Sequence, residues 1–336
     1  MKNQALKAVV IFFYLLSFFC FGRDILAQNG EWAVFNKTNS GLPDNTVFSV
    51  KVDKDQNIWA GTWNGGIAFF DRKDWKEYNI ENSPLPINYV YSILISKNEK
   101  WFGTFGGGLV KLKENNWQVF NTKNSGIPGN TIYSLDEEIN GKLWVGTWEG
   151  GVGGFDGEKW ENYNFRNSLL PGAKVPSLVV DAENWKWFGT TDGLVKYRDS
   201  VWVIESELEF ESTSKSVYSL AVSENNVIWV GLKYGGLAKF DGHEWEYYTT
   251  ENSKIPSNKI FGIAVESPNK IWVATNGHGL AKFENGEWTN YNSKNSGLPH
   301  DYLYSVSIDK FNNKWIGTLS GGLAVFNEEG LVGIYK

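Results

Sequence analysis

The sequence has almost no sulfur chemistry. Its 336 residues include one cysteine, Cys20, which lies in an apolar amino-terminal segment. Because that segment has the features of an export signal, we expect Cys20 to be removed with it. The mature chain then has no disulfide and no cysteine ligand for a metal, so its stability depends on packing alone.

The amino-terminal segment predicts export. Two lysines precede an apolar run over residues 8–21, and Ala27 offers a small residue for cleavage. We therefore assign residues 1–27 to a signal peptide and 28–336 to the mature chain, in the periplasm or outside the cell. A retained anchor is the alternative, but Ser17 interrupts the run, which is shorter than the roughly 20 apolar residues of a spanning helix.

A basic block is also missing. The chain has 32 Lys and Arg against 38 Asp and Glu, a formal net charge of −6, and loss of the signal peptide makes it more negative. An acidic chain without a basic cluster cannot neutralise nucleic-acid phosphates or anionic lipids. We therefore expect no nucleic acid among its partners, and no membrane span in the mature chain.

What the sequence does contain is a repeated phrase. Residues 144–155 read WVGTWEGGVGGF: a tryptophan, Gly-Thr, two free positions, Gly-Gly and an apolar or aromatic end. Seven such phrases begin at Trp59, Trp101, Trp144, Trp187, Trp229, Trp272 and Trp315. A second tryptophan recurs every 42 or 43 residues, at Trp32, Trp75, Trp117, Trp160, Trp202, Trp245 and Trp288. A fixed period in this range indicates a repeat architecture.

Each repeat predicts four short strands. The first follows a Pro-x-Asn loop, as in residues 46–52; the second begins at Trp-x-Gly-Thr, the third follows the glycine pair, and the fourth is W-x-x-[YF]. No stretch has a helical period. Four-stranded units of about 40 residues are typical of propeller blades. We predict an all-β, seven-bladed β-propeller with four antiparallel strands per blade, its tryptophans filling the wedges between blades.

The sequence leaves the closure of the ring open, because either residues 32–36 or residues 331–335 can complete the last blade. We favour residues 32–36, which keep the repeat tryptophan and join the two ends of the chain. Residues 331–335 then form a fifth strand or a loose tail.

The phrase W-x-G-T-x-x-G-G-[LI]-x-x-F, with its N-x-[VI]-x-S lead-in, resembles the two-component regulator propeller repeat. That repeat occurs in periplasmic sensor regions of bacterial hybrid two-component receptors. The resemblance implies a propeller that senses oligosaccharides. Because no linking domain, membrane helix or kinase follows the last repeat in this sequence, we expect a propeller that stands alone and has no kinase activity.

The predicted topology places the Asn-Ser-x-x-Pro loops and the Gly-Thr-x-x-Gly-Gly turns on one face, around the channel mouth. The free positions of these turns carry aromatic residues in several repeats, which can stack on a sugar or grip a peptide. The alternative is that these rings pack against neighbouring loops. The predicted ligand-binding residues are Trp63, Asn64, Tyr89, Phe105, Trp148, Glu149, Asp192, Lys233, Tyr234, His278, His300 and Tyr302.

Catalytic patterns are scarce. A sialidase needs several arginines at its site, and the mature chain has three, all predicted away from the mouth. His278 and His300 come from adjacent loops and, with Glu149, are the only material for a metal-assisted lyase or hydrolase. The turn at residues 53–57 lacks the graded ligand spacing of a calcium loop.

We therefore expect a monomeric, non-catalytic protein that uses no metal or other cofactor and binds a small glycan or a peptide at the mouth. A scaffold for a protein partner is the main alternative. A metal-assisted enzyme is the second.

Overall fold

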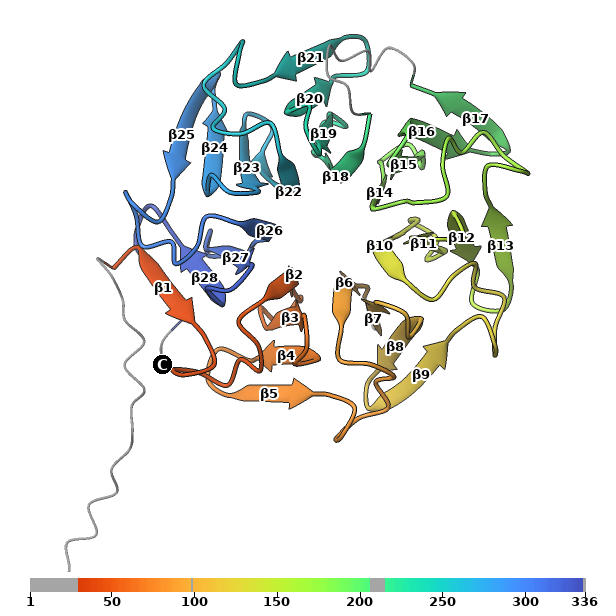
Figure 1. Cartoon of the computed structure of the whole chain (residues 1–336), viewed down its shortest axis with the longest axis horizontal. Helices are drawn as coiled ribbons and strands as arrows, with labels where there is room; N and C mark the ends of the chain where they lie inside the picture. The colour runs from red at the N-terminus through yellow and green to blue at the C-terminus, as the bar shows by residue number, and fades with distance from the viewer. Residues whose placement is uncertain (1–29, 98, 206–214, 335–336) are drawn as a thin grey trace, which may run out of the picture.

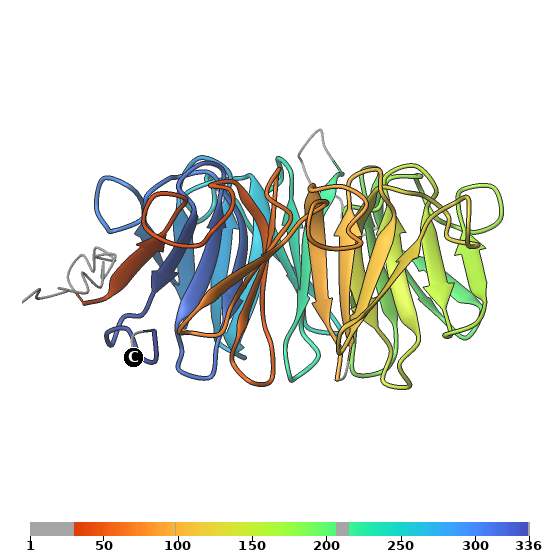
Figure 2. The same ribbon diagram turned by 90° about the horizontal axis from the view of Figure 1, so that it is seen from below.

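The structure, a computed structural model, describes residues 30–97, 99–205 and 215–334. Within these residues it consists of 28 strands in seven four-stranded antiparallel sheets. Figure 1 shows the sheets arranged as blades around a central axis, and Figure 2 shows the disc from its side. The predicted seven-bladed propeller is confirmed. The predicted signal peptide, residues 1–27, lies outside the described residues.

Each blade runs from an inner strand at the axis to an outer strand at the rim (Figure 1). The inner strands are β2 (Val47–Val52), β6 (Val90–Ile95), β10 (Ile132–Glu137), β14 (Ser177–Val180), β18 (Val217–Val222), β22 (Ile260–Ser267) and β26 (Leu303–Ile308). The second strands are β3 (Ile58–Thr62), β7 (Glu99–Thr104), β11 (Leu143–Thr147), β15 (Lys186–Thr190), β19 (Ile228–Leu232), β23 (Lys270–Thr275) and β27 (Lys314–Thr318). The third strands are β4 (Ile67–Phe70), β8 (Leu109–Lys113), β12 (Val152–Phe155), β16 (Gly193–Arg198), β20 (Leu237–Phe240), β24 (Leu280–Glu284) and β28 (Leu323–Phe326). The outer strands are β5 (Trp75–Tyr78), β9 (Asn116–Phe120), β13 (Trp160–Tyr163), β17 (Val201–Ile204), β21 (Trp245–Tyr248), β25 (Glu287–Tyr291) and β1 (Trp32–Phe35).

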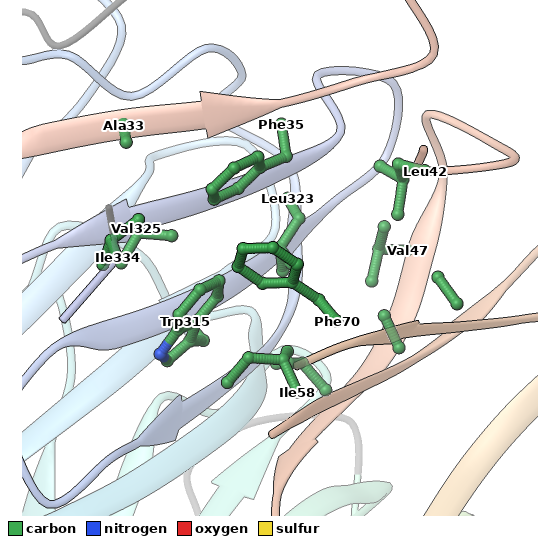
Figure 3. Packing of buried hydrophobic residues seen from close by; sticks show 13 residues of the cluster. Ala33, Phe35, Leu42, Val47, Ile58, Phe70, Trp315, Leu323, Val325 and Ile334 are labelled. Atoms are coloured by element: carbon green, nitrogen blue, oxygen red, sulfur yellow. The ribbon is translucent and has the colours of Figure 1, made fainter. Parts of the chain in front are cut away.

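The amino-terminal strand closes the ring. β1 pairs antiparallel with β28, with Trp32 opposite Phe326, so the favoured closure is confirmed. Figure 3 shows Phe35, Phe70 and Trp315 meeting where the first and last blades join. The segment 331–334 forms no strand, yet it is docked, because Ile334 is buried in this cluster. The expected fifth strand or loose tail is therefore wrong for these residues.

The second-strand tryptophans fill the spaces between blades, as predicted. Trp144 has no exposed surface and packs on Phe188 and Tyr197 of the next blade, at centroid distances of 5.6 Å and 5.7 Å. The glycines of the phrase are structural too. A Cβ on Gly146 would lie 2.6 Å from the carbonyl oxygen of Val175 in the next blade, and Gly151 has a φ of +81°.

Acidic residues near the ends of five inner strands anchor the second-strand tryptophan of the same blade. Asp53 accepts hydrogen bonds from the backbone N–H groups of Asp55 and Asn57, and its other oxygen accepts one from Trp59 Nε1 at 3.0 Å. The same arrangement joins Asp309 to Trp315. The turn at residues 53–57 is thus a tryptophan clamp, which explains why it lacks the spacing of a calcium loop.

An ionic cluster joins blades six and seven. Glu328 lies 2.5 Å from Lys282 Nζ and 3.1 Å from Lys270 Nζ, and accepts a hydrogen bond from the Tyr291 hydroxyl at 2.8 Å. Burial opposes ionisation of Glu328, but hydrogen bonds from Lys282, Tyr291 and Lys270 outweigh it and lower its pKa from 4.5 to about 2.

This cluster predicts a pH dependence of stability. Because folding lowers the pKa of Glu328, its contribution is present above about pH 4.5 and disappears as the pH falls toward 2. Between these pH values the wild type should lose roughly 1–2 kcal/mol more unfolding free energy than Glu328→Gln, allowing for solvent screening. Urea unfolding at a series of pH values measures this difference, and parallel losses in both proteins would contradict it.

Candidate functional site

The turns and loops predicted to share a face do so. The Gly151 N–H donates to the Ala173 carbonyl at 3.0 Å, so the turn after β11 contacts the loop that enters the next blade. Within the same blade, the Trp148 N–H donates to the Thr131 carbonyl at 3.0 Å, just before β10. Equivalent bonds in the other blades surround the channel mouth with a hydrogen-bonded rim.

A β-bulge opens six of the seven inner strands. In β2 the pairing with β3 passes from Val47 to Ser49, so Phe48 is left without a partner. Such a bulge re-aims the extra side chain. The unpaired residue is aromatic in all six blades: Phe48, Tyr91, Tyr133, Tyr218, Phe261 and Tyr304.

These six aromatic side chains, which we call the aromatic belt, line a cavity of about 130 Å³ together with Pro176. Neighbouring rings are in contact: Phe48 stacks on Tyr91 at 4.3 Å and meets Tyr304 edge-on at 4.7 Å. Tyr218 stacks on Phe261 at 5.3 Å. The belt and Pro176 of blade four therefore form a largely apolar wall that also carries phenolic hydroxyls.

The hydroxyls of Tyr91, Tyr133 and Tyr304 remain neutral. Burial, with the neighbouring Tyr133, raises the pKa of Tyr91 far above its usual value, and burial also raises the pKa of Tyr133 and Tyr304. A neutral phenol both donates and accepts hydrogen bonds. The cavity wall thus combines stacking surfaces with polar tips, a combination suited to a ligand that has both apolar faces and hydroxyl groups.

The predicted rim aromatics pack on this belt. Trp63 is 46% exposed and lies 5.4 Å from Phe48 and 4.9 Å from Tyr89. Phe105, 41% exposed, lies 6.4 Å from Tyr91. The rings therefore contact neighbouring side chains, as the structural alternative requires, and still present large exposed surfaces to the mouth.

Trp148 connects the rim to the cavity most directly. Its ring stacks on Tyr133 at 4.9 Å and 25°, and Lys174 Nζ of the next blade lies 4.4 Å from its centroid. On blade five, Tyr234 is 48% exposed, and Lys233 Nζ lies between it and Tyr218, 5.4 Å and 5.3 Å from the two rings.

Two predicted polar residues serve the rim itself. Glu149 Oε1 accepts hydrogen bonds from the backbone N–H groups of Asn130 and Thr131 at 2.8 Å and 3.2 Å. His300 Nδ1 accepts one from the Tyr302 N–H at 3.0 Å. Both side chains satisfy donors at the start of an inner strand, so these acceptor atoms are occupied by the protein.

The other predicted residues are spread around the mouth. Asn64, Asp192 and His278 are exposed, and Asp192 accepts a hydrogen bond from the Thr191 hydroxyl at 2.9 Å. Tyr302 is 45% exposed and lies beside His300, at a centroid distance of 5.5 Å. Among the residues that the structure describes, no three His, Cys, Asp or Glu side chains form a group that could hold a metal ion.

The belt is the part of the mouth that sequence reasoning missed. Its signal was an aromatic residue near the start of the first strand of the repeat, as in VFSV at residues 47–50, which recurs in six repeats and is replaced by Pro176 in the fourth. Strict alternation along a strand would instead direct these rings into the packing between sheets. The bulge changes that alternation and points them into the channel.

Comparison with known proteins identifies the repeat. A family model described as two component regulator propeller matches residues 41–64 and 126–149. These two segments therefore match the two-component regulator propeller repeat. Both matched segments end in a mouth turn, at Asn64 and Glu149. A comparison with curated protein sequences gave no match.

Solved structures share the propeller fold of these repeats. The extracellular domains of two hybrid two-component systems from B. thetaiotaomicron superpose with TM-scores of 0.75 and 0.73 at 23% and 17% identity, over 89% and 90% of this chain. The chain spans only 41% and 40% of those domains. Virginiamycin B lyase from Staphylococcus aureus superposes with a TM-score of 0.73 at 14% identity, over 90% of this chain and 99% of the lyase. At these identities the likeness concerns the fold.

No helix in the described ranges is both long and apolar enough to cross a membrane.

Proposed function

We propose that this propeller is a non-catalytic binding protein that takes a carbohydrate at the mouth. The observation that carries the proposal is the continuity of the aromatic surface, from exposed Trp63 and Phe105 and half-buried Trp148 on the rim to the belt around the cavity. Sugar rings have apolar faces that stack on aromatic rings and hydroxyls that bond to phenols.

The sensor domains in hybrid two-component systems support a role in recognition and signalling. We also propose a location in the periplasm or outside the cell, supported by the export segment in the sequence and by the extracellular neighbours. Cell fractionation tests the location: recovery of the full-length protein from the cytoplasm, with residues 1–27 still attached, would contradict it.

A binding experiment tests the proposed site. A glycan and peptide screen identifies the ligand, and calorimetry then measures its affinity. Trp148→Ala should lower the affinity for the glycan at least roughly tenfold, because a central aromatic anchor carries a large share of binding energy. Phe165→Ala is a matched control: Phe165 is 56% exposed and packs against Arg166 instead of the belt. It should leave the affinity unchanged.

Three outcomes would count against this proposal. A glycan whose affinity is insensitive to Trp148→Ala binds elsewhere on the disc. If the screen finds a peptide ligand and no glycan ligand, the mouth recognises peptides. Capture of a folded protein partner, with no small ligand, favours the scaffold alternative.

A further inference from the structure

Three lysines gather on one side of the mouth, on blades four, five and six. Lys174 Nζ lies 4.4 Å from the ring of Trp148, and Lys259 Nζ lies 5.5 Å from the ring of Tyr234. Lys233 Nζ lies 5.3 Å from Tyr218, a member of the belt. Lys233 thus contacts the belt directly, and Lys174 reaches it through Trp148, which stacks on Tyr133. Lys259 lies beside Tyr234, whose ring Lys233 also contacts.

These lysines differ from most lysines that pack on aromatic rings elsewhere in the protein. Several of those have a carboxylate within 4 Å, as Lys142 has Glu161 and Lys196 has Glu205. In the described part of the chain, none of the three mouth lysines forms an ion pair. Four carboxylates on the same face accept hydrogen bonds from backbone or hydroxyl donors: Asp44, Glu149, Asp192 and Asp301.

Positive charge concentrated in this way is notable in a chain with a net charge of −6. Like charges around one opening repel each other, and an anion placed among them removes that repulsion. The aromatic rim residues Trp63, Tyr89 and Phe105 lie on blades one and two, away from the lysines. The mouth therefore has a stacking side and a cationic side.

We propose that the ligand is an anionic oligosaccharide, whose sugar rings stack on the aromatic side while a carboxylate or sulfate group binds Lys174, Lys233 and Lys259. This inference rests on the proposed carbohydrate site and adds the charge of the ligand. The shared chemistry is an acid group on a sugar, and the probes below separate uronic acids from sulfated sugars.

The test compares ligands that differ only in charge. Oligogalacturonate is measured against its methyl ester, and a chondroitin sulfate oligosaccharide against its desulfated form, by calorimetry on the full chain. The acid forms should bind at least roughly tenfold more tightly than their neutralised or less charged partners. Their affinity should fall as salt rises from about 50 to 500 mM, because exposed charges are screened. A difference only in the first pair identifies the uronic acid, and one only in the second pair identifies the sulfate.

Variants supply the second arm. Replacing Lys174, Lys233 and Lys259 together by Gln should weaken the acid ligand roughly tenfold or more, since each ion pair adds a modest amount. The control replaces three exposed lysines of the opposite face by Gln, Lys54, Lys73 and Lys159, with the same change of net charge. It should leave binding unchanged, and circular dichroism checks that both triple variants remain folded.

The outcomes separate this inference from the proposed function. Equal affinity for acid and neutral sugars, lost in Trp148→Ala but kept in the lysine triple variant, overturns the inference and leaves the carbohydrate site intact. Binding of an oligoglutamate peptide without binding of any sugar contradicts both. Equal losses in the mouth and control triple variants would show a non-specific charge effect and also overturn the inference.

Discussion

Replacing Trp144 with alanine should lower the free energy of unfolding by about 3–5 kcal/mol, the range for removing a large buried aromatic side chain. Trp144 is fully buried between blades three and four, and its Nε1 donates to Glu138 Oε1 at 2.8 Å. The substitution therefore leaves a cavity at a blade interface and removes one hydrogen bond from Glu138 Oε1, which keeps its ion pair with Lys186 Nζ at 3.2 Å. Chemical denaturation monitored by circular dichroism measures the loss.

Trp148→Ala is the matched control, because Trp148 lies four residues further along the same hairpin but is only half-buried at the mouth. The loss of unfolding free energy in Trp148→Ala should be smaller than that in Trp144→Ala by at least about 1–2 kcal/mol. Equal losses in the two variants would mean that the mouth residues belong to the structural frame.

The second large effect is expected at the seam of the ring. Asp309 accepts hydrogen bonds from Trp315 Nε1 at 2.9 Å and from Arg72 Nη2 of the first blade at 2.7 Å. Arg72 also donates to the carbonyl of Gly333 at 3.2 Å, which holds the carboxyl-terminal segment. Asp309→Ala leaves the mostly buried guanidinium group of Arg72 without its carboxylate partner. Because removing one partner of a buried ion pair costs about 3–5 kcal/mol, we expect a loss of unfolding free energy of that size.

Asp53→Ala provides the comparison. Asp53 clamps Trp59 as Asp309 clamps Trp315, but has no arginine partner among its hydrogen bonds. The unfolding free energy that Asp309→Ala loses beyond the loss in Asp53→Ala therefore measures the contribution of the Arg72–Asp309 ion pair to ring closure. If thermal unfolding shows equal losses, Arg72 contributes nothing to ring closure.

The seam also responds to pH. Burial disfavours the charged form of Asp309, but hydrogen bonds from Trp315, Arg72 and Asn313 outweigh it and hold its pKa below the usual value. Its stabilising contribution is therefore present at neutral pH and is lost as the pH falls through that lowered pKa. Acid should therefore weaken the contact between the first and last blades, the same contact that Asp309→Ala weakens.

The frame and the mouth use different residues of one hairpin. In blade three Trp144, Gly146 and Gly151 hold neighbouring strands and blades together. Trp148, at a free position of the turn, faces the mouth and stacks on Tyr133. Because the turn is fixed by its glycines and backbone bonds, its free positions can vary without loss of the fold. Substitution at these positions can therefore change the proposed ligand binding without changing the fold.

Much of this was predictable from the repeat. The period of 42 or 43 residues predicted the blades. Aromatic residues at the free positions of the turns predicted the rim aromatics Trp63, Phe105 and Tyr234, which are exposed. Three features were not predicted in their observed form. Glu149 bonds to its own rim, the belt residues leave the sheet at bulges, and residues 331–334 dock at the seam.

The physical reason is the range of the interactions. Strand alternation, turn glycines and the tryptophan period are local properties of the chain, so the order of residues is sufficient to predict seven blades and the face on which their turns meet. The direction of a side chain and the identity of its neighbours in space are not local properties. Whether Tyr133 points into the channel depends on a pairing shift between two strands, and whether Lys174 is without a carboxylate depends on side chains from several blades. The belt and the cationic side of the mouth therefore exist only once the ring is closed.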